Sequence, residues 1–221
     1  ASALSLRMPC FSAIQGTGDL LFMGGHAPDL VNLYAYSVEP IATVARITGR
    51  GIKLGNIRIK NTTGHMLALA ENPSNNFTMS LFDGDGGIDG ITQGNTLQNF
   101  RAQSVTIQNA TGLALNLRGG SNFRFDSLTL TNNGTAIRLD TAISGTSVVI
   151  GSLTTSGNTT VPSNNLAVGI LGDIFINKSS IAEASPLSAI SGTDYTSGRL
   201  VFQNYNGTTN DHRTYYGSIS N

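Results

Sequence analysis

Two stretches, Ser104-Val-Thr-Ile-Gln-Asn-Ala-Thr-Gly112 and Ser127-Leu-Thr-Leu-Thr-Asn-Asn-Gly134, align with each other up to a shared asparagine. A third copy, Asn56-Ile-Arg-Ile-Lys-Asn-Thr-Thr-Gly64, precedes them. The aligned asparagines are Asn61, Asn109 and Asn132, so their intervals in sequence number are 48 (109 − 61) and 23 (132 − 109). The spacing corresponds to two periods of about 24 residues followed by a slightly shorter one, and such repeats are typical of solenoid proteins.

Each copy contains two candidate strands on either side of a polar corner. Before the corner, apolar and polar residues alternate, as they do in a half-buried strand. After the corner glycine, the third and fifth residues are apolar again: Leu67, Leu69, Leu115, Leu117, Ile137 and Leu139. Asparagine suits the corner because it tolerates the left-handed backbone conformation and can hydrogen-bond its own backbone, and stacked asparagines can form a ladder. The pattern predicts an all-β protein, a right-handed parallel β-helix.

Two other repetitive folds fit less well. A leucine-rich repeat has a similar period but needs a fixed Leu-x-x-Leu-x-Leu frame, which is absent. An antiparallel sandwich gives turns every 8–12 residues or so, without a register of about 23 residues. We therefore expect irregular leading rungs at 1–50, a parallel β-helix at 51–200 and a closing segment at 201–221.

Composition excludes several classes of function. Thirteen Lys and Arg balance thirteen Asp and Glu, so the chain lacks the positive excess of a nucleic-acid binder. No stretch approaches the roughly 18 apolar residues of a membrane span, so we expect no membrane insertion. Cys10 is the only cysteine, which rules out an internal disulfide framework and a cysteine-based zinc site.

The tail carries a resemblance to a known family. Residues 201–220 contain Asn204-Tyr-Asn-Gly207 followed by Asp211-His-Arg213. This run resembles the closing segment of bacteriophage tailspike and capsule-depolymerase β-helices, and the polar rungs with few charges are similar to tailspike shafts. The resemblance implies a homotrimer on the virion tail that acts outside the host cell. It also implies binding and cleavage of a capsular or O-antigen polysaccharide, by the C-terminal part of a longer protein.

Trimerisation has a second, independent sequence signal. Met66, Ala114 and Ala136 each lie two residues after a corner glycine, where we expect outward-facing side chains. A column of small apolar residues on the outside of a solenoid would suit contact with a neighbouring protomer.

One rung departs from the repeat. Leu81-Phe-Asp-Gly-Asp-Gly-Gly-Ile-Asp-Gly90 replaces the asparagine corner and places Asp83, Asp85 and Asp89 within seven residues. Asp83 and Asp85 face the same side of an extended strand, and Asp89 can return beside them after the turn. Paired carboxylates serve glycoside hydrolysis, which makes these three residues our catalytic candidates. The same spacing could bind Ca²⁺, although it is not an EF-hand loop, and Asp-Gly pairs are also ordinary turn residues.

A polysaccharide lyase would instead need a base and a cation that neutralises a uronate carboxylate. Arg58 and Lys60 share the outward face of one strand, and His65 and Glu71 belong to the next strand of that unit. These four residues are the substrate-binding candidates. Neighbouring rungs stack about 4.8 Å apart, so Arg58 and Lys60 could share a surface with the aspartate corner.

The charged residues of the tail are interpreted as structural. Asp211, His212 and Arg213 are consecutive, so in a strand they face alternate sides and cannot converge on one substrate. Tyr205, Tyr215 and Tyr216 could stack on sugars, or could close the end of the core.

These observations lead to the hypothesis of a tailspike depolymerase that needs no cofactor, with hydrolysis preferred over elimination. A non-enzymatic glycan-binding or structural shaft is one alternative, and a secreted lyase resembling pectate lyase is another.

Overall fold

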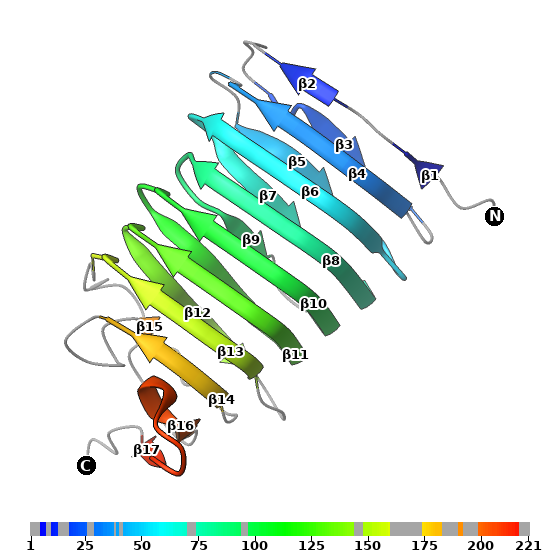
Figure 1. Cartoon of the computed structure of the whole chain (residues 1–221). Helices are drawn as coiled ribbons and strands as arrows, with labels where there is room; N and C mark the ends of the chain where they lie inside the picture. The colour runs from blue at the N-terminus through cyan, green and yellow to red at the C-terminus, as the bar shows by residue number, and fades with distance from the viewer. Residues whose placement is uncertain are drawn as a thin grey trace.

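A computed structural model describes residues 5–7, 10–12, 18–25, 29–37, 39, 42–69, 74–93, 97–143, 148–159, 174–182, 190–191 and 199–216. In this part of the chain, strands stack one above another along a single axis (Figure 1). The only helix among these residues is the short 3-10 turn η1 (Tyr205–Gly207). The strands pair in parallel register from rung to rung, which confirms the predicted parallel β-helix.

The strands form two stacks. The first contains β1 (Ser5–Leu6), β2 (Cys10–Ser12), β4 (Asp29–Tyr36), β6 (Lys53–Thr62), β8 (Ser74–Gly86), β10 (Leu97–Gln108), β11 (Leu113–Thr131), β13 (Val148–Ser156), β14 (Ile174–Ile181) and β16 (Arg199–Asn204). The second contains β3 (Leu21–Met23), β5 (Thr43–Ile47), β7 (His65–Leu69), β9 (Ile91–Gln93), the first part of β11, β12 (Thr135–Ile143) and β15 (Ile190–Ser191). The step between register partners on adjacent rungs is not constant along the chain. It is 23 in sequence number from Phe100 to Phe123 (123 − 100) and 26 from Ile174 to Leu200 (200 − 174).

The long strands of the first stack bend halfway along their length. In β6, Gly55 and Asn56 both face outward between the buried Leu54 and Ile57, which breaks the alternation of inward and outward residues. An asparagine pair marks this bend, because Asn56 Nδ2 donates to Asn32 Oδ1 at 2.9 Å. Each long strand therefore contributes to two faces of the β-helix, one before the bend and one after it.

The predicted corner asparagines adopt the left-handed conformation, with φ of 51° at Asn61, 58° at Asn109 and 54° at Asn132. A buried ladder forms one residue further on: Asn133 Nδ2 donates to Asn158 Oδ1 at 2.9 Å. The corner asparagine faces solvent, whereas the next residue faces the interior, where backbone groups require partners. The sequence suggested a ladder of the corner asparagines themselves, whereas the buried hydrogen bond joins Asn133 and Asn158, each one residue after its corner.

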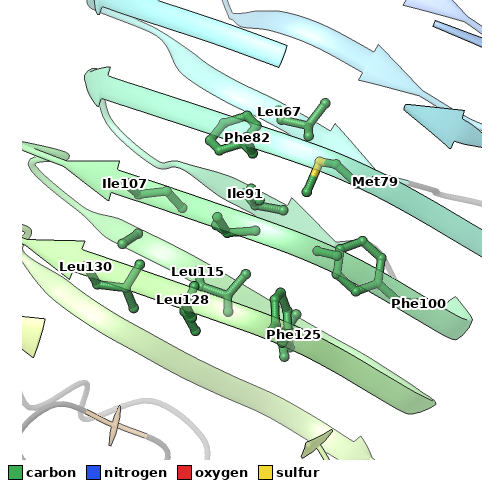
Figure 2. Packing of buried hydrophobic residues seen from close by; sticks show 14 of the residues in the cluster. Leu67, Met79, Phe82, Ile91, Phe100, Ile107, Leu115, Phe125, Leu128 and Leu130 are labelled. Carbon is green, nitrogen blue, oxygen red and sulfur yellow. The ribbon is translucent and has the colours of Figure 1, made fainter. Parts of the chain in front are cut away.

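Aromatic and aliphatic side chains fill the interior in columns (Figure 2). The ring centre of Phe100 lies 5.1 Å from that of Phe77 and 5.3 Å from that of Phe125, so successive rungs are joined by ring contacts. Most of the apolar positions that follow the corner glycines are also buried, namely Leu67, Leu69, Leu115, Leu117 and Ile137.

The predicted outward column of Met66, Ala114 and Ala136 is wrong, because all three side chains are fully buried. The residue after each of them is buried as well, since the chain turns through the corner there and two consecutive side chains face the interior. These residues provide no surface for a neighbouring protomer.

The two ends of the described β-helix differ from each other. Within 1–50, the described strands pair in parallel with the following rungs, as the middle strands do, for example β4 with β6. Near the other end, β17 (Arg213–Tyr216) pairs antiparallel with β16. The guanidinium of Arg213 lies 3.7 Å from the ring centre of the buried Tyr205 and binds Asp211 at 3.0 Å. These contacts agree with the structural interpretation of Asp211 and Arg213, because they hold the segment that pairs with the edge of β16.

Candidate functional site

The outer face beyond the bend of β4, β6 and β8 carries two columns of aromatic, polar and charged side chains. Strand register places Cys10, Tyr34, Arg58 and Asp83 in one column. It places Ser12, Tyr36, Lys60 and Asp85 in the other. The columns lie two residues apart along each strand, so all of these side chains belong to one face. Rungs stack about 4.8 Å apart, which brings successive members of each column into contact distance.

These columns line an open groove with a volume of about 410 Å³. Its lining residues are Cys10, Ser12, Tyr34, Ala35, Tyr36, Arg58, Lys60 and Asp83. The groove thus combines aromatic surface with hydrogen-bonding and charged groups, which is the composition of a site for a polar ligand with an apolar face.

The two tyrosines are exposed because of strand alternation. Leu33 and Ala35 are buried, so Tyr34 and Tyr36 must face outward, and they are 38 % and 55 % exposed. The Arg58 guanidinium lies 5.9 Å from the ring centre of Tyr34, within the range of a cation–π contact. The same alternation in residues 29–36 was visible in the sequence, but we did not select these tyrosines as site residues.

The charged side chains of the groove are partly paired. Lys60 Nζ donates to Asp83 Oδ1 at 2.5 Å, and this contact runs diagonally between the adjacent strands β6 and β8. Arg58 and Lys60 against Asp83 give the groove lining a formal charge of +1 (2 − 1). Asp85, beside Lys60 in register, accepts hydrogen bonds from Gln108 Nε2 at 2.9 Å and Asn109 Nδ2 at 2.8 Å.

Asp89 does not join the other two carboxylates. Its Oδ1 accepts a hydrogen bond from the Leu113 backbone N–H at 2.7 Å, and its Oδ2 lies 3.0 Å from His65 Nδ1. The glycine turn after Asp85 therefore carries Asp89 to the residues just before β9, in the second stack, instead of returning it to the groove. Among the described residues, no three His, Cys, Asp or Glu side chains gather as a metal site.

The structure thus separates the predicted site residues into two groups. Arg58, Lys60, Asp83 and Asp85 share one outer face, and the first three line the groove, whereas His65 and Asp89 contact each other elsewhere. Glu71 lies outside the described residues.

Searches of protein-family models, curated proteins and solved structures returned no match to this chain. Within the described residues, no helix has the length and apolar character needed to cross a membrane.

Proposed function

We propose that this chain binds a polysaccharide in the groove of Tyr34, Tyr36, Arg58, Lys60 and Asp83, and that it depolymerises this polymer. The observation that carries the proposal is the exposure of two tyrosines beside ionic side chains on a rigid sheet face. Sugar rings present apolar C–H faces and polar edges, so tyrosine rings can stack on the faces while charged side chains bind the edges.

The biological setting that we propose is a phage tailspike. In that setting a homotrimer on the virion tail recognises a capsular or O-antigen polysaccharide at the host surface. The support is the closing segment at 201–220, together with a β-helix whose outer face carries the groove. A trimer would have three times the 23.1 kDa mass of the chain, and sedimentation equilibrium measures that mass directly.

Hydrolysis is the first candidate reaction. Asp83 and Asp85 face the same side of β8, and in an extended strand their Cα atoms are about 7 Å apart. Two carboxyl groups on one face of a strand can flank a glycosidic bond, one protonating the leaving oxygen and the other activating water or attacking the sugar. Asp83 lines the groove itself, so we assign it the direct contact with the substrate, and we assign Asp85 as the second carboxyl group.

Elimination is the second candidate, and the two cations of the groove lining, Arg58 and Lys60, support it. Arg58 and Lys60 could neutralise the carboxylate of a uronate residue, and a tyrosine could accept the proton from the carbon next to that carboxylate. The bond from the following carbon to the glycosidic oxygen would then break, and the leaving oxygen would take up a proton. The product would carry a new double bond, whereas hydrolysis would not create one.

One experiment separates these reactions. The chain is incubated with a panel of purified capsular and O-antigen polysaccharides, and reducing ends are followed together with the absorbance of unsaturated uronates. Reducing ends alone indicate hydrolysis, and both signals together indicate elimination. Binding of a panel member without either signal would contradict depolymerisation by this chain and would favour a glycan-binding shaft.

Variants then test the assignment of the carboxylates. D83N and D85N should each lower the rate of hydrolysis by about 10²-fold or more, as expected on loss of an acid or base. D19N is the matched control, because Asp19 also forms an exposed ion pair, with Arg46 at 2.6 Å, but lies outside the groove. Wild-type rates in both D83N and D85N would remove this pair from the mechanism.

A further inference from the structure

A second groove lies on the opposite side of the strand bend. It has a volume of about 330 Å³ and shares no lining residue with the first. Its lining comes from the parts of β10, β11 and β13 that precede their bends: Asn99, Phe100, Arg101, Asn122, Phe123, Arg124 and Val149. This groove therefore belongs to a different face and to later rungs than the candidate site.

Two arginines dominate this groove. Arg101 and Arg124 are register partners on adjacent rungs, and their side chains are 56 % and 59 % exposed. Like charges directly opposite each other in a sheet repel, so a pair of this kind needs a counter-charge. Neither arginine occupies an inward position, and neither supports the core.

Asp126 supplies that counter-charge and fixes the geometry. Its Oδ2 accepts from Arg101 Nη2 at 3.1 Å and its Oδ1 accepts from Arg124 Nε at 3.0 Å. The hydrogen bond from Arg124 and the interaction with Arg101 lower the pKa of Asp126, although partial burial opposes the shift. One carboxylate between two guanidiniums leaves a formal charge of +1 (2 − 1).

The guanidiniums retain capacity for a ligand. Each carries five N–H donors, and Asp126 engages one nitrogen of each side chain. Along the groove, Asn122 Nδ2 donates to Asn99 Oδ1 at 2.9 Å, so amide groups form a fixed polar edge. Val149 adds apolar surface. A planar anion on a carrier with hydroxyl groups and an apolar face fits this combination.

We propose that Arg101 and Arg124, held in place by Asp126, bind the carboxylate of an acidic sugar residue in this second groove. That the carboxylate belongs to a sugar rests on the proposed function. That the groove binds an anion is argued from the two arginines and does not depend on the proposed function. Guanidiniums bind carboxylates through paired N–H donors, and this geometry selects a carboxylate over a neutral hydroxymethyl group at the same position.

The test is an NMR titration of the whole chain that follows the arginine Nε–Hε signals, assigned by their loss in R58K, R101K and R124K. The probes are hexagalacturonate, its carboxyl-reduced form and inorganic phosphate. We expect hexagalacturonate to shift the Arg101 and Arg124 signals in a saturable way. We expect the carboxyl-reduced form to leave them unshifted. We expect phosphate to shift them only at concentrations at least about tenfold higher, because phosphate lacks the sugar rings that would contact Val149 and the asparagine amides.

Calorimetric titration of variants measures the energetic role of the arginines. R101Q and R124Q should each weaken binding of hexagalacturonate at this groove by about tenfold, as expected on loss of a charge-assisted pair. R50Q removes the same charge from an exposed site outside both grooves and should change the affinity by less than about twofold.

Three results would overturn the proposal: Arg101 and Arg124 signals unmoved by hexagalacturonate, equal shifts with the carboxyl-reduced probe, or equal shifts with phosphate at the same concentration. If hexagalacturonate shifts only the Arg58 signal, the second groove is excluded as its binding site, and the proposal for the first groove still stands. Failure of the tyrosine groove would instead appear as unchanged glycan binding on substitution of Tyr34, so the two proposals fail separately.

Discussion

The early and late rungs of the same sheet face share a backbone but carry different chemistry. Beyond the bend, β4, β6 and β8 present two tyrosines, two cations and two carboxylates. At the equivalent register positions, β10, β11 and β13 present only hydroxyl and amide side chains: Thr106, Gln108, Thr129, Thr131, Thr154 and Ser156. Both halves have the same alternation of buried and outward residues.

This difference shows that the β-helix and the candidate site are independent features of the sequence. The buried columns determine the fold, and they tolerate any outward residue that does not break the strand. The outward columns determine what the surface can bind. The groove at Tyr34 and Tyr36 is therefore attributable to a few outward substitutions on an otherwise uniform scaffold.

The largest expected effect comes from breaking the scaffold that both halves share. F100A removes a fully buried ring that contacts three other phenylalanines, and it should lower the free energy of unfolding by about 3–5 kcal/mol. Urea denaturation measures the change. T106A, an outward change in the same strand, should alter the free energy of unfolding by less than about 0.5 kcal/mol. A loss below about 1 kcal/mol in F100A, on the order of a surface change, would contradict this account of the core.

The next largest effect is expected at the corner ladder. Asn133 accepts from the Ala110 backbone N–H at 3.0 Å and donates to the Ile107 carbonyl at 3.1 Å, so N133A leaves buried backbone groups without this partner. We expect a loss of about 2–3 kcal/mol in the free energy of unfolding, again by urea denaturation. T131A, two residues earlier on the outer face, should be close to neutral. Equal stability of the two variants would mean that the ladder does not hold the corner.

A double substitution can give one column of the early rungs the threonines that the late rungs carry at the same register. Y34T with R58T places threonine where the later rungs have Thr106 and Thr129, so the fold should persist. Binding of the polysaccharide identified by the panel should weaken by at least about tenfold, which corresponds to about 1.4 kcal/mol. Calorimetry measures the affinity, and T129S with T154S provides the matched change in the late half. Equal affinities of the two double variants would place the glycan site elsewhere.

The smallest effect concerns the pH dependence of stability at Asp126. Its pKa in the folded state is lowered from the ordinary value of 3.8, so its ion pairs stabilise the fold above that value and are lost as pH falls further. The melting temperature of D126N should lie slightly below that of the wild type at pH 7, because the ion pairs are partly exposed and worth little. The difference should shrink as the pH is lowered from about 5 to about 2. A difference that stays constant over this range would show that Asp126 acts by packing and not by charge.

Much of the fold was predictable because its signals are local. The alternation around Ile57, Ile107 and Leu130 and the asparagine corners depend only on residues within one rung. The grouping of the candidate residues was predicted in part: Arg58, Lys60, Asp83 and Asp85 do share one face, whereas Asp89 and His65 lie elsewhere. The direction in which a chain leaves a glycine turn is not encoded by spacing alone, since Gly86 and Gly87 both adopt positive φ there.

The sequence by itself determined the repeat, the parallel β-helix and the inward or outward orientation of strand residues away from the corners and bends. Only the tertiary structure decided which outward residues become neighbours, because the length of a turn varies along the chain and each change moves the register of the next rung. Tyr34, Arg58 and Asp83 are well separated in the sequence and belong to three different rungs, yet they occupy one column. For a related reason Met66, Ala114 and Ala136 are buried: the chain turns at the corner, where strand alternation does not apply.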